Sequence, residues 1–189
     1  MIPEAVRKQV GRQLIQNLMA TAHLDEETAR RAAKALQPYL KTISTHSLSA
    51  ITVEALMKLR AAVRYYGRNR IHLRKDMGKD TPFPLSFDQV TNFAKLRTFG
   101  LAVHADKTNP RSGWWLLTDR GNKFLAGELR IESKVYTFLG HPVHAEGAPA
   151  EKLVSINDYR DQLPKFETYQ DFTAPRVERK PIETISMFG

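Results

Sequence analysis

The sequence predicts an α+β protein built from four successive parts. Apolar residues recur at helical spacing in the first 66 positions, and short apolar runs separated by glycines follow them. β-Branched and aromatic residues then gather after residue 130. We expect an N-terminal helical hairpin over 1–48, a central domain over 49–130, a β-hairpin extension over 131–163 and an extended tail over 164–189.

The N-terminal part carries two helical patterns. The apolar residues expected to form the buried stripe of the first helix are Val6, Val10, Leu14 and Leu18. Asp25 is suited to cap a second helix, rich in inward-facing alanines, which Pro38 would kink or end. So small a pair of helices has a limited core, and we expect it to pack on its own chain or on a second copy in a homodimer. A mostly polar connector is expected over 44–49.

A helix and an alternating basic segment open the central part. We expect Thr52 to cap a helix that runs to Tyr66 and ends at Gly67. Over 68–75, cations alternate with apolar residues, which predicts a short strand or an extended arm. The proline- and glycine-rich segment 78–84 is expected to be a turn.

A second capped helix has strong local signals. Ser86 and Gln89 have the spacing of a capping box, and Gly100 suits the left-handed residue that ends a helix, so a helix is expected over 86–99. The residues expected on its buried face are Val90, Phe93 and Leu96, with Ala94 as a further candidate. Its opposite side would then carry polar groups.

Two short strands are expected to enclose a polar loop. A strand over 101–103 leads into the loop 104–113, and a partner strand begins at Trp114 before Thr118 caps another helix. Trp114 and Trp115 are adjacent, so one ring should face the core and the other should face outward. The outer ring would stack on a base or a partner, or simply cover the base of the loop.

The last third of the chain predicts β-structure and then a tail. A strand over 131–139, a turn at Gly140 and His141 and a return strand over 142–145 form the expected hairpin, with a further strand over 153–156. From residue 164 onward polar and aromatic residues mix with prolines. We expect this tail to be ordered only where its aromatic rings find a groove.

Two stretches carry a family resemblance. Lys95-Leu-Arg-Thr-Phe-Gly-Leu-Ala-Val103 and Trp115-Leu-Leu-Thr-Asp-Arg-Gly-Asn-Lys-Phe-Leu125 resemble the winged helix-turn-helix superfamily, with the pattern seen in MarR- and PadR-like regulators. The hairpin over 134–143 is also similar to that of small phage-borne winged-helix proteins. The resemblance covers about residues 51–143 and implies a winged-helix core, a module that serves DNA, RNA and proteins.

The resemblance also implies site residues. The helix over 86–99 would take the recognition-helix position, where Gln89, Asn92 and Lys95 would face a major groove. The loop 104–113 would be the wing. Its cations expected to meet phosphate or the minor groove are Lys107 and Arg111.

Two features depart from the winged-helix pattern. Pro82 and Pro84 occupy the space of the usual second helix, so that helix is expected to be missing or reduced. Asp88 places a negative charge where phosphate would approach, although an acid near a helix start also stabilises the helix dipole.

The net charge of +9 is concentrated in the middle of the chain. Eight of the 29 basic residues lie within 57–80, against two acids, which attracts a polyanion. Those expected to bind nucleic acid are Arg60, Arg64, Arg68, Arg70, Arg74 and Lys75. The alternative is a solvated basic face without a partner.

The composition favours no catalysis and no cofactor. Zero cysteines exclude disulfides and thiolate metal sites, and His141 with His144 on a hairpin would point to opposite faces, so no metal site is expected. No nucleophile or phosphate-loop signature occurs, so we expect no enzyme activity. With neither an apolar run long enough for a membrane nor a secretory start, a cytoplasmic protein is expected.

Three hypotheses about function follow. The first is a non-enzymatic protein that binds double-stranded DNA as a regulator or accessory factor of a phage or mobile element. The second is a protein-interaction module that docks on or inhibits a larger nucleoprotein complex in phage–host conflict, through the N-terminal hairpin or the C-terminal tail. The third is RNA binding through the arginine-rich segment and its neighbouring aromatic residues.

Overall fold

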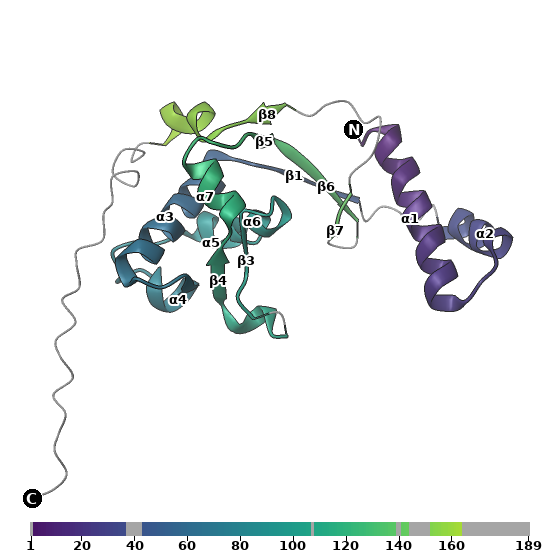
Figure 1. The fold of residues 1–189 in the computed structure, drawn as a ribbon, viewed down its shortest axis with the longest axis horizontal. Coiled ribbons are helices and arrows are strands. Elements are labelled where there is room, and N and C mark those ends of the chain that lie inside the picture. Colours follow the sequence, from purple (N-terminus) through teal and green to yellow (C-terminus); the bar gives the residue numbers. More distant parts are fainter. Residues whose placement is uncertain (1, 37–42, 107, 139–140, 144–151, 164–189) are drawn as a thin grey trace, which may run out of the picture.

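The protein is an α+β chain in its computed structural model, which describes residues 2–36, 43–106, 108–138, 141–143 and 152–163 (Figure 1). Expectations for Pro38, Lys107 and Gly140, for most of the return strand and for the tail lie outside these residues. Three small antiparallel sheets and seven α-helices make up the described part. Within it, no helix has the length and apolarity needed to cross a bilayer.

The N-terminal hairpin is confirmed as α1 (Glu4–Ala22) and α2 (Glu26–Leu36). Asp25 caps α2 as predicted, because its carboxylate accepts the backbone N–H of Thr28 at 3.0 Å and the hydroxyl of the same residue at 2.7 Å. Val6 and Val10 are buried, whereas the next two members of the expected stripe are only half-buried. The hairpin therefore contacts the rest of the chain mainly through the first half of α1.

A long β-ribbon replaces the expected polar connector. Strand β1 (Ile43–Ser47) pairs along its whole length with β6 (Lys134–Phe138), and β7 (His141–Pro142) lies on the other side of β6. The prediction of a connector over 44–49 was wrong because backbone hydrogen bonds hold a strand whatever its side chains are. The partner strand β6 lies about ninety residues later in the chain, so no local sequence pattern could predict this pairing.

Helix α3 (Ala50–Tyr66) is the centre of the fold. Ser49 caps it by accepting the N–H of Thr52, and the cap predicted at Thr52 was wrong, because Thr52 already lies in the first turn of the helix. Gly67 ends the helix with a φ of 60°, as predicted.

The second sheet has the order β2-β4-β3, all antiparallel. The prediction of an extended basic segment holds for β2 (Arg70–His72), which is followed at once by the four-residue helix α4 (Leu73–Asp76). Strands β3 (Ala102–His104) and β4 (Trp114–Leu117) enclose the predicted loop, in which η2 (Pro110–Ser112) forms one turn. The helix expected to be missing or reduced before the capped helix is thus present as the short α4.

The capped helix predicted over 86–99 is divided into α5 (Phe87–Phe93) and α6 (Lys95–Thr98). The capping box is confirmed in both directions, and Gly100 ends α6 with a φ of 68°. Thr118 caps α7 (Asp119–Leu125) as predicted. A Cβ on Gly121 would lie 2.2 Å from the carbonyl oxygen of Leu101, so only glycine allows α7 to approach β3 this closely.

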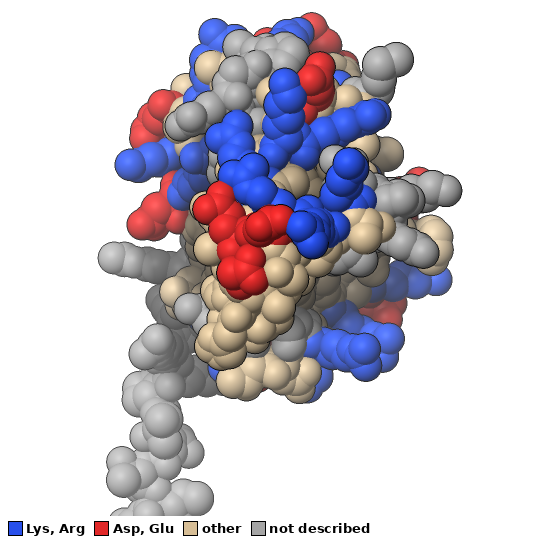
Figure 2. Space-filling view, turned by 90° about the vertical axis from the view of Figure 1, so that its right-hand side faces the viewer, with Lys and Arg blue, Asp and Glu red and all other residues tan. Residues whose placement is uncertain are grey.

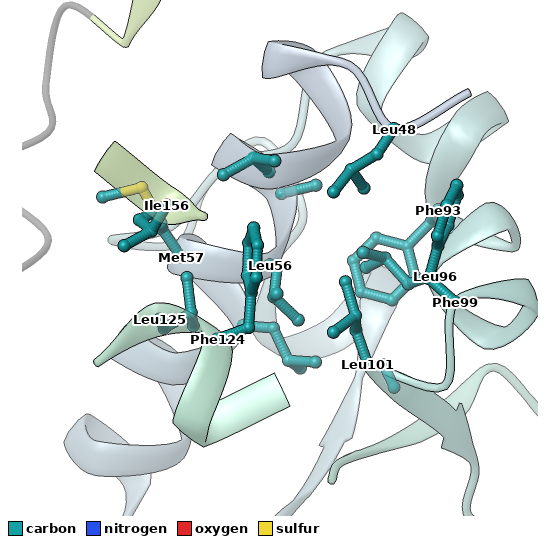
Figure 3. Packing of buried hydrophobic residues seen from close by; sticks show 14 of the residues in the cluster. Leu48, Leu56, Met57, Phe93, Leu96, Phe99, Leu101, Phe124, Leu125 and Ile156 are labelled. Atoms are coloured by element: carbon teal, nitrogen blue, oxygen red, sulfur yellow. The ribbon is translucent and has the colours of Figure 1, made fainter. Parts of the chain in front are cut away.

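The main core surrounds α3, as Figure 3 shows for Leu56, Phe93 and Phe124. Residues from β5 (Ile131–Glu132), β8 (Leu153–Val154) and η3 (Ile156–Gln162) complete it, and the hydroxyl of Tyr159 donates to the carbonyl of Leu48 at 3.0 Å. A second, small core lies at the far end of the β1–β6 ribbon, against α1 (Figure 1). Its buried residues are Val6, Val10, Ile43, Tyr136, Phe138 and Val143.

Candidate nucleic-acid interface

The β2-β4-β3 sheet has one buried and one accessible face. Side chains alternate along each strand, so Ile71, Trp115 and Ala102 point into the core, where each is at most 4% exposed. The prediction that one tryptophan faces inward and the other outward is confirmed. The opposite side, which we name the outer face, consists of Arg70, His72, Val103, Trp114 and Leu116.

Trp114 is the aromatic centre of the outer face. The guanidinium carbon of Arg70 lies 4.9 Å from the centroid of its ring, and that of Arg68 lies 5.6 Å away. The ring of His72 meets it edge-on at 4.9 Å between centroids. Arginine over an aromatic face is an attractive cation–π arrangement, so these contacts gather two positive charges around one half-buried ring.

Arg68 is oriented by a buried carboxylate. Asp76 is 7% exposed, and one of its oxygens lies 2.6 Å from Nη2 of Arg68. Its other oxygen accepts the backbone N–H of His72 at 2.8 Å. Asp76 therefore ties α4 to β2 and holds the guanidinium of Arg68 at the edge of the outer face.

The imidazole of His72 connects β2, α4 and the loop before β4. Its Nδ1 accepts the backbone N–H groups of Arg74 and Lys75 at 3.1 and 3.2 Å, which caps α4. The N–H of Leu73 donates to the carbonyl of Gly113 at 3.0 Å. Gly113 has a φ of 76°, and a Cβ there would lie 3.2 Å from the imidazole. The exposed cations of α4 thus lie beside the outer face on a fixed scaffold.

The loop 105–113 carries both signs of charge. Arg111 is exposed as expected. Asp106 organises the turn by accepting hydrogen bonds from the Thr108 hydroxyl and from two backbone N–H groups. These hydrogen bonds hold the pKa of Asp106 below its ordinary value, and the charge of Arg70 lowers it further. An acid therefore lies close to the cations of the outer face.

The expected recognition helix presents its surfaces differently. Gln89 is 3% exposed, and its Oε1 accepts the N–H of Ser86 at 3.0 Å and the ammonium of Lys58 at 2.9 Å. Its expected contact with a groove is wrong, because the capping box and α3 already occupy its amide. Asn92 is half-buried and donates to the carbonyl of Asp88 at 2.8 Å.

Lys95 and Arg60 also point away from the expected surface. Lys95 is half-buried beside β1, where its charge adds to the effect of burial in lowering the pKa of His46. Arg60 is only 5% exposed, and burial lowers its pKa to about 10, with a smaller effect from the charge of Arg64. The expected contact of Arg60 with nucleic acid is therefore wrong, whereas Arg64 is exposed near the end of α3.

The accessible side of α5 is mainly apolar. Phe87 is 85% exposed and Val90 is 51% exposed, so the prediction that Val90 is buried was wrong. The residues of this surface, which we name the exposed α5 face, are Phe87, Asp88, Val90, Thr91 and Ala94. The capping box was the sequence feature that could have predicted this. When Gln89 bonds back to Ser86, its side chain turns inward, and the buried face of α5 moves by one position.

A separate group of cations covers the N-terminal hairpin, which faces the viewer in Figure 2. Acids are interspersed there, and Lys8, Arg30 and Arg31 each pair with a glutamate one turn earlier on the same helix. Such exposed pairs offset the local positive charge. The hairpin is therefore a weaker attractor of polyanions than the outer face.

A shallow cavity of about 270 Å³ lies between α6, α7 and the β5–β7 region, with Arg97 and Arg120 on its wall. Arg120 donates through Nε to the carbonyl of Phe99 at 3.2 Å, so this guanidinium is already engaged. The described residues contain no group of three metal-ligating side chains, and His144 lies outside them. Comparisons with protein-family models, curated proteins and solved structures gave no match.

Proposed function

We propose that residues 50–125 form a winged-helix module that binds nucleic acid without catalysing a reaction. The order α3, β2, α4, α5–α6, β3, loop, β4 and the sheet order β2-β4-β3 support this interpretation. In it, α5 and α6 take the position of the recognition helix and the loop 105–113 is the wing. The chain would act as an accessory factor or regulator of a phage or mobile element.

The observation that carries the proposal is the basic surface around Trp114. Arg68 and Arg70 lie beside this ring, and further exposed cations come from the end of α3, from α4 and from the loop. We name these residues the basic edge: Arg64, Arg68, Arg70, Arg74, Lys75 and Arg111. Because such contacts go to phosphates, they hold a nucleic acid without reading its sequence, whether it is duplex DNA, a single strand or RNA.

The test is a salt titration of the full chain against duplex DNA, single-stranded DNA and RNA of equal length. Each neutralised phosphate releases counterions, so log K should fall linearly with log salt, with a slope of roughly −0.7 to −0.9 for each contact. Four to six contacts predict a slope of about −3 to −5. A slope near zero, or no binding to any of the three at low salt, would overturn the proposal.

A second candidate function rests on the exposed α5 face. An accessible phenylalanine beside an accessible valine, with Asp88 and no cation between them, suits a protein surface better than a phosphate backbone. The chain would then dock on a protein of a larger nucleoprotein complex. A partner retained in stoichiometric amount after nuclease treatment, and lost with Phe87→Ser, would favour this function over direct binding of nucleic acid.

A further inference from the structure

The outer face has the features of a platform for a flat ring. Trp114 lies directly opposite His72 across the β2–β4 pair, and Leu116 lies opposite Arg70. The buried Trp115 packs edge-on against Phe93, with their ring centroids 5.0 Å apart, which fixes β4 from the inner side. The backbone N–H of Ala105 donates to the carbonyl of Trp114 at 2.9 Å, which fixes the strand from the β3 side.

Two positive charges at this platform lie beside the ring of Trp114. At 4.9 and 5.6 Å from the ring centroid, the guanidinium carbons of Arg70 and Arg68 lie within cation–π range. Both side chains are exposed. Arg70 can therefore turn toward a phosphate and leave a face of the indole to another flat group, while Arg68 stays paired with Asp76.

We propose that Trp114 stacks on an unpaired base and that this contact makes the chain prefer single-stranded nucleic acid over duplex. The inference rests on the proposed nucleic-acid function. Inside a duplex both faces of each base are covered by neighbouring bases, whereas a single strand can place a base on an aromatic ring while its phosphates meet arginine. The exposed α5 face offers few groups that pair with base edges in a major groove, which also disfavours duplex readout.

The two tryptophans of the chain make this inference directly measurable. Trp115 is 4% exposed and Trp114 is half-buried, so a stacked base should quench the fluorescence of Trp114 alone. The ligands are a twelve-nucleotide thymidine strand, an abasic strand of the same length and a duplex of the same length. The variants are Trp114→Phe, which keeps a ring, and Trp114→Leu, which removes it, each in the full chain.

The expected result has three parts. The thymidine strand should quench the wild-type chain but not Trp114→Phe, whose remaining indole is buried. Trp114→Leu should bind that strand about five- to a hundredfold more weakly, the range that stacking of one base contributes, while Trp114→Phe keeps most of the affinity. The abasic strand and the duplex should bind all three chains with similar affinity, because their contacts are to phosphate.

The outcomes separate this inference from the function on which it rests. If the duplex binds as well as the thymidine strand, or if Trp114→Leu weakens the abasic strand equally, stacking is refuted while binding of nucleic acid stands. If none of the ligands binds at low salt, both proposals fail. Should Trp114→Leu not fold, the quenching difference between the wild-type chain and Trp114→Phe and the preference for thymidine over abasic strands still decide the matter.

Discussion

The outer face and the exposed α5 face belong to one compact module, yet they are chemically opposite. The outer face combines a tryptophan with Arg70 of β2, and Arg68, which follows the end of α3, lies beside the same ring. The exposed α5 face combines a phenylalanine and a valine with a single acid. Where a winged-helix resemblance would place the base-reading contacts, the structure has an apolar surface, and the exposed cations lie on β2 and on the segments beside the sheet.

This difference shows that a helix's position in the fold does not decide which side chains its surface presents. Helix α5 directs Gln89 and Phe93 toward α3, which leaves Phe87 and Val90 outside. The outer face gains its charge from Arg70, on an edge strand, and from the neighbouring Arg68 and α4. The exposed charge between residues 57 and 80 therefore lies around β2 and not on the helix that follows.

The largest expected effect tests whether one face of α5 is packed in the core and the opposite face is exposed to solvent. Phe93 is 1% exposed and Phe87 is 85% exposed, so Phe93→Ala should lower the free energy of unfolding by about 3–5 kcal/mol. Phe87→Ala should change it by about 0.5 kcal/mol or less. Urea denaturation of both variants checks this, and equal losses would show that Phe87 is covered in solution, for instance by a second copy of the chain.

The next effect concerns binding at the basic edge. Replacing Arg70, Arg74 and Lys75 together by alanine should weaken binding to every nucleic acid about a hundredfold near 0.1 M salt and make the salt slope shallower by roughly two to three. Fluorescence anisotropy at several salt concentrations measures both quantities. These three exposed cations are chosen because Arg68 also holds the buried Asp76.

The matched control removes the same charge from the N-terminal hairpin. Arg7, Arg12 and Lys34 are exposed on α1 and α2, and replacing all three by alanine should change affinity by less than about threefold. If both triple variants lost affinity equally, overall charge rather than the basic edge would drive binding.

A smaller effect is expected at the carboxylate that links β2 to α4. Asp76→Ala leaves the N–H of His72 and the guanidinium of Arg68 without this acceptor, and should cost about 2 kcal/mol of unfolding free energy. Thermal unfolding checks the loss. Asp80→Ala, at an exposed acid four residues later, is the control and should leave the melting temperature nearly unchanged.

The smallest effect is a dependence of stability on pH. Burial lowers the pKa of His46 and of His104, with smaller contributions from the charges of Lys95 and Arg97 respectively. As pH falls below about 6.5, the unfolded chain takes up protons that the folded chain resists, so stability present above that pH is lost.

Both histidines lie outside the outer face, so their protonation should not change the affinity of the folded chain for nucleic acid. The free energy of unfolding should be lower at pH 5 than at pH 7.5, and replacing both histidines with glutamine should flatten the difference. An unchanged pH dependence in the double variant would show that other groups cause it.

Local sequence was sufficient for many of the elements of this fold. Three helix starts were predicted from their caps, at Asp25, at Ser86 with Gln89 and at Thr118. Two helix ends were predicted from Gly67 and Gly100. Each of these signals acts within one helical turn, through a side chain that satisfies a backbone group or a glycine that adopts a positive φ. That is why they can be predicted without knowledge of the fold.

The candidate site was predictable only in part. The concentration of arginines near β2 and the division of Trp114 and Trp115 between two faces followed from composition and strand alternation. The burial of Arg60 and Gln89 did not, because helical periodicity fixes which residues share a face but not which face meets the core.

The sequence by itself determined the caps, the turns and the place of the positive charge along this chain. Only the tertiary structure decided that β1 pairs with β6 across some ninety residues and that α5 turns Phe87 outward. It also decided that Arg68, before β2, and Arg70, on β2, converge on Trp114 of β4. The physical reason is range: a cap or a turn depends on neighbours in the chain, whereas pairing, burial and a shared surface depend on residues that folding alone brings together.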